Sequence, residues 1–222
     1  MPPDNPMAAV AAASESSVNS AGRAGGASPA AVKFLIAGGF GVGKTTLVGT
    51  VSEIPPLTTE EYLTRASEAT DCLTGVEAKT TTTVCMDFGR ITFGEPQPMV
   101  LYLFGTPGQE RFWFGWDDLA HGADGAVVLA DTRRLADSFA PVDFFEQRDL
   151  PFIVAVNQFD GAPRYTPDEV RQALELPLQV PVLLCDVRQR RSAATVLIAL
   201  VRHVLSRPHP ASRTNDRYGD ER

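Results

Sequence analysis

The chain is short of cysteine, of lysine and of long apolar runs, and each shortage excludes a class of protein. Its cysteines, Cys72, Cys85 and Cys185, show no CxxC or Cys/His spacing, which argues against disulfides or a zinc site. No apolar run approaches the roughly 20 residues needed to cross a bilayer, and neither end carries a lipidation signal. We therefore expect a cytoplasmic protein without direct membrane insertion, so any membrane contact should come through a partner.

Positive charge is also scarce. The 20 Lys and Arg residues stand against 27 Asp and Glu, which gives a formal net charge of −7. Only three of the basic residues are lysines, at positions 33, 44 and 79. Because such a surface repels a phosphate backbone, we expect no binding to nucleic acid.

The two ends of the chain have too little apolar bulk to form a core. Residues 1–31 are mainly Ala, Ser, Gly and Pro with no aromatic side chain, and residues 207–222 are similarly polar. Such compositions do not bury enough surface to offset the entropy of ordering the chain. We predict disordered tails at 1–31 and 207–222 and one compact domain at 32–206.

Between these ends, short apolar runs alternate with helical patterns. The apolar runs lie at 32–38, 83–93, 99–104, 125–131, 151–157 and 181–186, and the helical patterns lie near 44–54, 109–120, 134–148, 167–174 and 192–205. The alternation predicts an α/β fold with six strands in a mostly parallel sheet and helices on both faces. Since only "GEPQP" joins the second run to the third, we expect these two strands to form an antiparallel hairpin at the edge.

The segment "GGFGVGKT", Gly38 to Thr45, fits the P-loop pattern G-x-x-x-x-G-K-[ST] between a predicted strand and a predicted helix. The backbone N–H groups of such a loop hold phosphate oxygens, and the following helix adds the positive end of its dipole. Lys44 is predicted to reach the terminal phosphates, and the Thr45 hydroxyl to bind Mg²⁺. The predicted nucleotide contacts here are Gly38, Gly41, Val42, Gly43, Lys44, Thr45 and Thr46.

A second polar segment, "NQFD", follows the fifth apolar run. An Asn–x–x–Asp pair after a strand favours guanine, because the carboxylate of Asp160 can accept from both N1–H and the exocyclic amine of that base. Taken alone, the segment would suit a polar turn better than a base-binding site. Together with the P-loop, it makes Asn157, Gln158 and Asp160 predicted contacts to the base.

With these segments in place, the chain resembles a Ras-like small GTPase from Val32 to about Ser206. "NQFD" is similar to that family's NKxD, "FGTPGQERFWF" resembles its DTAGQE segment, and Cys185, Asp186 and Val187 stand where SAK is expected at the base. The strings "KTTTTV", "FGTPGQERFWF" and "VVLADTRRLADSF" look closest to the actinobacterial conservon GTPases. The TPGQ form is also similar to the bacterial polarity GTPases of gliding motility.

The resemblance implies further roles. Gly108 would donate its N–H to the γ-phosphate, and Gln109 would orient the attacking water. "TVCMDF" resembles the first switch of Rab-type proteins, which makes Thr83 the expected second protein ligand of Mg²⁺, although the run of four threonines leaves that register open by one residue. Two positions depart from the family pattern: Gly105 stands where an aspartate usually supports Mg²⁺ through its water shell, and Gln158 replaces a lysine.

Two other segments are expected to serve partners or access to the site. Residues 57–73 have a capping-box start at Thr58 and Glu61 and amphipathic spacing, which fits a packed insertion and a mobile lid equally well. Four aromatic residues follow Gln109, namely Phe112, Trp113, Phe114 and Trp116. They cannot all share one helix face, so we expect some of them to be exposed and to anchor a partner.

The sequence thus predicts a Mg²⁺-dependent GTPase in which Gln109 and Lys44 act in catalysis and Thr45 and Thr83 bind the metal. The alternative is a guanine-nucleotide-binding adaptor with negligible turnover, given the departures at Gly105 and Gln158. A metabolic P-loop kinase would need a second substrate site with clustered arginines, and none is evident. The resemblance implies two partners, a roadblock-domain regulator and a membrane-bound histidine-kinase-like protein, which would recruit the chain to the inner face of the membrane.

Overall fold

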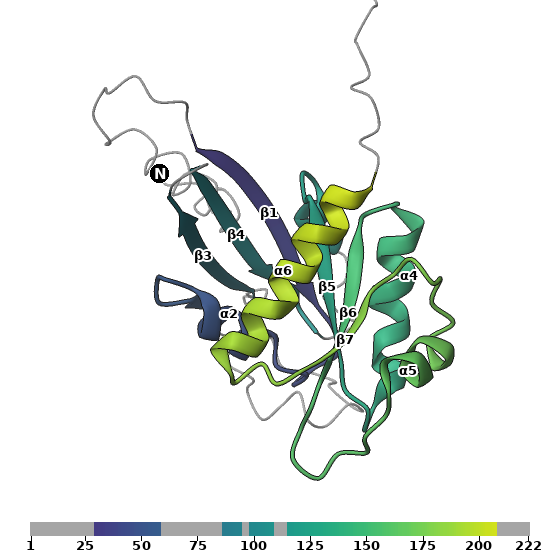
Figure 1. Cartoon of the computed structure of the whole chain (residues 1–222). Coiled ribbons are helices and arrows are strands. Elements are labelled where there is room, and N and C mark those ends of the chain that lie inside the picture. Colours follow the sequence, from purple (N-terminus) through teal and green to yellow (C-terminus); the bar gives the residue numbers. More distant parts are fainter. Residues whose placement is uncertain (1–28, 59–85, 95–97, 109–114, 208–222) are drawn as a thin grey trace, which may run out of the picture.

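The computed structural model describes residues 29–58, 86–94, 98–108 and 115–207. A seven-stranded sheet in the order β2-β3-β4-β1-β5-β6-β7 forms its centre (Figure 1). The strands are β1 (Ala30–Ala37), β2 (Leu57–Thr58), β3 (Asp87–Phe93), β4 (Met99–Gly105), β5 (Gly125–Ala130), β6 (Phe152–Asn157) and β7 (Val182–Cys185). The strands from β4 to β7 pair in parallel through β1, while β3 runs antiparallel to β4 and to β2. The α/β fold and the edge hairpin are confirmed, and the two-residue β2 adds one strand to the six expected.

The helices follow the strands in the expected alternation. They are α2 (Lys44–Val51), α3 (Trp116–Ala120), the 3₁₀ turn η3 (Leu135–Ser138), α4 (Phe139–Gln147), α5 (Pro167–Ala173) and α6 (Arg190–Ser206). The helix expected at 44–54 ends early at Val51, and Ser52, three residues before the Pro55–Pro56 pair, takes an extended conformation. α5 begins with a capping box between Thr166 and Glu169 and has Pro167 in its first turn.

The central strands divide their side chains between two hydrophobic cores, as the two-residue period requires. In β1, Phe34 and Ile36 pack on the face covered by α2 and α6, and Leu35 and Ala37 pack on the face covered by α3, α4 and α5. Figure 1 shows α6 running across one face of the sheet, with α4 on the other side. α6 contributes four buried residues at helical spacing to its core, namely Ala193, Val196, Leu197 and Leu200.

The chain leaves β1 and β5 toward opposite faces of the sheet. β1 leads into α2, which packs in the first core, whereas the neighbouring β5 leads through η3 into α4, which packs in the second. In open α/β sheets a crevice for ligands forms at such a point, outside the carboxyl ends of the strands. The glycine-rich segment after β1 therefore lies at the position where this fold binds ligands.

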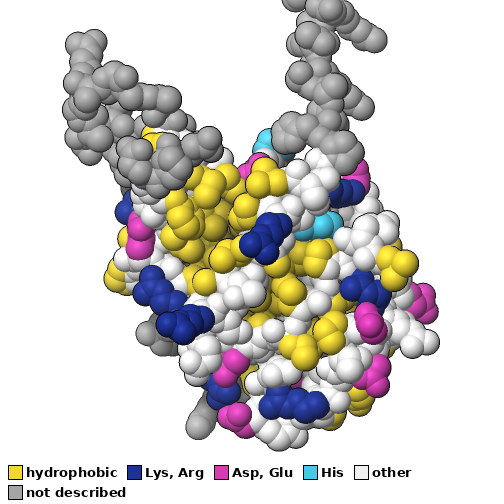
Figure 2. Space-filling view, in the orientation of Figure 1, with side chains coloured by type: hydrophobic (Ala, Val, Ile, Leu, Met, Phe, Trp, Pro, Cys, Tyr) yellow, Lys and Arg dark blue, Asp and Glu magenta, His cyan; other side chains and the backbone are white. Residues whose placement is uncertain are grey.

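An apolar groove lies between α6 and the β3–β4 hairpin, toward the start of β1. Figure 2 shows hydrophobic side chains gathered on this face, and those lining the groove include Val51, Ile91, Phe93, Met99, Leu101, Leu197, Ile198 and Val201. β1 starts beside it, since Ala30 pairs with Met99. Among the helices within the described ranges, none combines the length and the apolar character needed to cross a membrane.

Leu200 tests the packing of α6 on the sheet. Its side chain is fully buried, so Leu200→Ala should lower the free energy of unfolding by about 2–5 kcal/mol through lost burial and the cavity left behind. The matched control is Leu205→Ala on the same helix, because Leu205 is 78% exposed and its change should stay within about 0.5 kcal/mol. Urea unfolding followed by circular dichroism measures both, and equal losses would contradict the assigned burial.

Candidate functional site

The loop between β1 and α2 has a backbone that only glycine can follow at two of its positions. Gly38 has φ 135°, and a Cβ there would lie 2.4 Å from the Leu129 carbonyl oxygen of β5. Gly43 has φ 107°, and a Cβ there would lie 2.9 Å from Nδ2 of Asn157. Both angles belong to a region that L-residues avoid. The glycines of the predicted P-loop are thus required by its packing against β5 and β6.

Lys44 is held inside this loop. Its Nζ donates hydrogen bonds to the carbonyl oxygens of Gly38 and Gly39, both at 2.8 Å, and the residue is 9% exposed. Gly108 comes close to the same ammonium group, because a Cβ on Gly108 would lie 2.5 Å from Lys44 Nζ. The lysine and Gly108, both predicted to meet the terminal phosphates, are brought together at the mouth of the loop.

Thr45 faces the β3–β4 hairpin across the first turn of α2. Its hydroxyl Oγ1 donates a 2.6 Å hydrogen bond to Oδ2 of Asp87, the first residue of β3. Asp87 is only 4% exposed. The sequence reasoning missed this carboxylate. In the observed register of the β3–β4 pair, Asp87 stands directly opposite Gly105.

Asn157 ties the phosphate-binding loop to the end of the sheet. Its Nδ2 donates to the Val42 carbonyl oxygen at 3.0 Å, and its Oδ1 accepts from the Val187 N–H at 3.2 Å. The residue is 4% exposed, so both bonds are shielded from water. A single amide side chain therefore joins the loop after β1, the end of β6 and the segment after β7.

Asp160 and Asp186 share one arginine. Arg188 donates to Asp160 Oδ2 at 2.9 Å through Nη1 and to Asp186 Oδ1 at 2.9 Å through Nε. These hydrogen bonds hold the pKa of both carboxyl groups below the usual range, while the two acids raise the pKa of the guanidinium. Asp160 is exposed and stays ionised, as an acceptor for a base edge must be.

The three residues expected to stand in for SAK differ in what they can offer a ligand. Cys185 and Val187 are buried in the core, and burial raises the pKa of the Cys185 thiol to about 12. Only the Asp186 side chain is partly exposed, and the Asp186 N–H donates to Ser192 Oγ at 2.9 Å. The side chains of Cys185 and Val187 thus serve packing.

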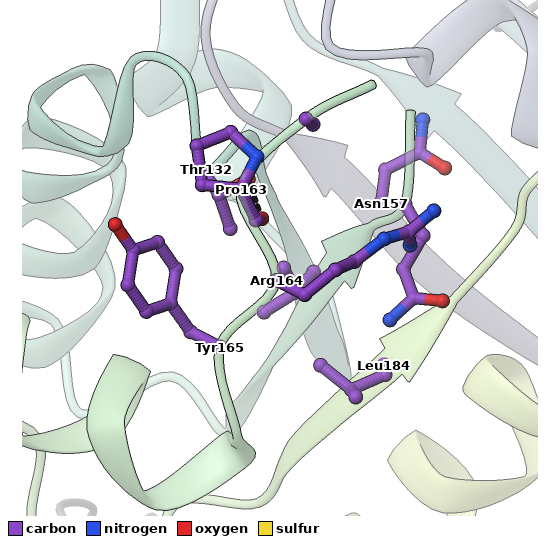
Figure 3. A pocket seen from close by; sticks show the side chains of 9 residues that line it. Thr132, Asn157, Pro163, Arg164, Tyr165 and Leu184 are labelled. Carbon is purple, nitrogen blue, oxygen red and sulfur yellow. Dashed lines mark hydrogen bonds between the residues drawn. The ribbon is translucent and has the colours of Figure 1, made fainter. Parts of the chain in front are cut away.

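Beside the predicted base site, the loop after β6 folds back on the loop after β5. The Thr132 hydroxyl donates to the Pro163 carbonyl oxygen at 2.8 Å, and Arg164 extends toward Asn157 (Figure 3). Arg164 adds a positive charge that lowers the pKa of Asp160 and of Asp186. These two loops enclose a small pocket, and Gln158 is one of the residues that line it.

Arg134 is a second contact that the sequence reasoning missed. Its Nη2 donates to the Phe40 carbonyl oxygen of the phosphate-binding loop at 2.6 Å. Its guanidinium nitrogens also lie 4.0 Å from Oδ2 of Asp131 and 3.9 Å from Oδ2 of Asp137, so both acids favour its positive charge at this place. An arginine in the segment after β5 gave no signal because its partner is a backbone oxygen 94 residues away.

The remaining predicted residues lie in or beside segments outside the description. Thr83, Gln109, Phe112, Trp113 and Phe114 are outside the described residues, as is most of the predicted insertion at 57–73, apart from β2. Trp116 is described and is buried at 2% exposure. Its ring packs on Phe144 and Phe145 and its Nε1 donates to the Pro107 carbonyl oxygen. The expectation that Trp116 belongs to an exposed anchor is therefore wrong, because this ring completes the second core.

Asn157→Ala tests the junction of the three segments before any ligand is added. The change leaves the Val42 carbonyl and the Val187 N–H without their buried partner, which should cost about 1–3 kcal/mol in the free energy of unfolding. Asn157→Asp should also destabilise the fold, since a carboxylate cannot donate to the Val42 oxygen. Gln158→Ala is the neighbouring control and should change stability much less. Ligand-free unfolding curves equal to the wild type would refute the junction.

Comparisons with known proteins agree with this geometry. The model of the family described as "Conserved hypothetical ATP binding protein" matches residues 36–207. An uncharacterized protein of Methanocaldococcus jannaschii is 27% identical over 131 residues, which cover 58% of this chain and 71% of that protein. The cytosolic domain of the T. maritima FeoB iron transporter in a GDP form matches with a TM-score of 0.57 at 17% identity. That match covers 82% of this chain and 66% of the FeoB chain, just under two thirds, and it shows a shared fold.

Proposed function

Since the chain belongs to the family described as conserved hypothetical ATP binding proteins, we propose that its glycine-rich loop binds a nucleotide and that this nucleotide is GTP or GDP. The observation that carries the proposal is the position of Asn157 and Asp160. Asn157 is bonded to the phosphate-binding loop, and Asp160 follows it by three residues at the same edge of the sheet. A base held beside this loop would meet the ionised carboxylate.

Guanine suits this carboxylate better than adenine does. The N1–H and the exocyclic amine of guanine are two adjacent donors, whereas adenine presents an acceptor at N1. A site that offers an acceptor pair rejects a base that lacks the matching donors. Arg188 keeps Asp160 ionised and oriented, so binding of guanine would add to an existing ion pair or replace it.

The phosphate side of the proposed site consists of the loop N–H groups, Lys44 and Gly108. Lys44 supplies the positive charge for the terminal phosphates, and the start of α2 adds its dipole. Within the described ranges, no three His, Cys, Asp or Glu side chains are grouped to hold a metal ion by themselves. Mg²⁺ typically takes one or two protein oxygens together with phosphate oxygens and water, which fits the Thr45 hydroxyl at this position. When bound, the ion would neutralise charge on the phosphates.

Hydrolysis of GTP is the second part of the proposal. Gln109 would orient the water and Thr83 would complete the metal ligands, with the two switch segments ordered by the γ-phosphate and released afterwards. By resemblance to the conservon and polarity GTPases, the chain would act as a cytoplasmic signalling switch. Its proposed partners are a roadblock-domain regulator and a membrane-bound histidine-kinase-like protein, which would bring it to the inner face of the membrane. The competing adaptor function would keep nucleotide binding and lack turnover.

Base specificity is tested by Asp160→Asn. GDP should displace fluorescent mant-GDP from the wild type far better than ADP does, and Asp160→Asn should shift preference toward xanthosine diphosphate, whose 2-oxo group suits an amide donor. Asp168→Asn is the control, because it removes an exposed carboxylate in the first turn of α5 and should leave the guanine preference intact. Equal competition by ADP and GDP in the wild type would favour the adenine nucleotide of the family description.

Turnover is tested by single-turnover hydrolysis of GTP. The predicted first switch offers no obvious arginine finger, and Lys79 lies four residues before Thr83. The isolated protein should therefore be slow, on the order of 10⁻⁴ to 10⁻² s⁻¹, and Gln109→Leu should slow it further with GTP affinity unchanged. A roadblock-domain partner should accelerate the wild type, and Trp113→Ala should weaken that effect. A rate at the uncatalysed background, with and without the partner, would leave the adaptor as the function.

A further inference from the structure

At the end of β4, Gly105 stands where the GTPases that this chain resembles have an aspartate. The neighbouring strand β3 carries a carboxylate, Asp87, beside this position. In the antiparallel β3–β4 pair, Asp87 stands directly opposite Gly105. Residues directly opposite each other on neighbouring strands extend to the same face of the sheet. A side chain at position 87 can therefore reach the space that a side chain at position 105 would otherwise enter.

The two positions cannot both carry a side chain without movement. A Cβ built on Gly105 would lie 2.9 Å from the Cβ of Asp87 and 2.9 Å from its Oδ2, closer than such atoms approach in proteins. The Asp87 carboxylate thus occupies the volume next to position 105. The glycine at 105 and the aspartate at 87 thus form one arrangement, in which the carboxylate beside position 105 comes from β3.

The hydrogen bond from Thr45 gives this carboxylate a chemical role. The Thr45 hydroxyl donates a 2.6 Å hydrogen bond to Asp87 Oδ2. With its proton committed, the hydroxyl oxygen presents its lone pairs away from Asp87, as a metal ligand must. Carboxylates that bond to a metal ligand orient it and raise its affinity for the ion.

We propose that Asp87 is the carboxylate that supports Mg²⁺ at this site, orienting Thr45 and accepting from the water shell of the ion in place of a residue at 105. The inference rests on the proposed nucleotide function, because the ion would enter with the phosphates. It makes Asp87 a positioning residue whose contribution is the placement of the Thr45 oxygen and one negative charge beside the cation.

The experiment measures how Mg²⁺ controls nucleotide release, without any need for turnover. The rate of mant-GDP dissociation is recorded over a series of free Mg²⁺ concentrations and in EDTA, for the full chain and its variants. Asp87→Asn and Asp87→Ala should raise the Mg²⁺ concentration for half-maximal retention about 10- to 100-fold, while dissociation in EDTA stays close to that of the wild type. Asp143→Asn, which removes an exposed carboxylate of α4, is the control and should change neither rate.

An exchange of the two positions makes the test specific. Gly105→Asp alone should destabilise the hairpin, because its Cβ meets Asp87. In the double variant Asp87→Gly, Gly105→Asp, that contact is removed and the acid returns to β4, so Mg²⁺ dependence should recover to within a few-fold of the wild type. Recovery would also exclude general damage to the fold as the cause of the single-variant effect.

The outcomes separate this inference from the proposed function. If the wild type binds no mant-GDP even at high Mg²⁺, the nucleotide proposal fails, and the inference fails with it. If mant-GDP binds and Asp87→Asn keeps the Mg²⁺ dependence of the wild type, only the role of Asp87 is overturned. A folded exchange variant that shows no recovery, beside single variants that lose the dependence, would also overturn it, since a carboxylate at this place would then not be enough to support the ion.

Discussion

The candidate site depends on the side-chain hydrogen bonds that fix the backbone of the glycine-rich loop. Lys44 donates to the carbonyl oxygens of Gly38 and Gly39, and Asn157 donates to that of Val42. These bonds engage three carbonyl oxygens of the loop and hold its backbone beside the buried ammonium group. The proposed phosphate site depends on this arrangement, because backbone N–H groups of a fixed loop next to a positive charge favour phosphate oxygens.

The sheet brings these groups together from distant parts of the chain. Parallel pairing of β1, β5, β6 and β7 places their carboxyl ends at the same end of the sheet. There Asn157 bonds to the glycine-rich loop and Arg188 bonds to Asp160. Because β3 runs antiparallel to β4, its first residue, Asp87, lies beside the carboxyl end of β4, where it accepts the hydrogen bond from Thr45. Phosphate, cation and base would therefore each meet a different part of the sheet, joined by bonds to the one loop.

Charge is arranged in small groups at this edge. Arg188 is shared between Asp160 and Asp186, and Arg134 lies between Asp131, Asp137 and the Phe40 carbonyl oxygen. The pairs of Arg188 and the pair of Arg134 with Asp137 are exposed, and such pairs contribute little to stability, about 0–1 kcal/mol. Their effect here is on geometry, because each arginine holds a carboxylate or a loop segment in one orientation beside the place where a ligand would bind.

The sequence by itself determined the fold class, the P-loop and the Asn–x–x–Asp segment, because these follow from short-range patterns: a two-residue period in strands, glycines where φ is positive, and a lysine next to them. It could not assign Trp116, since burial of one ring depends on Phe144 and Phe145 from another helix. Only the tertiary structure paired Arg134 with the phosphate-binding loop and Arg188 with Asp160. For Asp87, the sequence predicted the hairpin that contains it. Its position opposite Gly105 and its hydrogen bond to Thr45 came only with the structure, because the bond requires α2 and β3 to pack together.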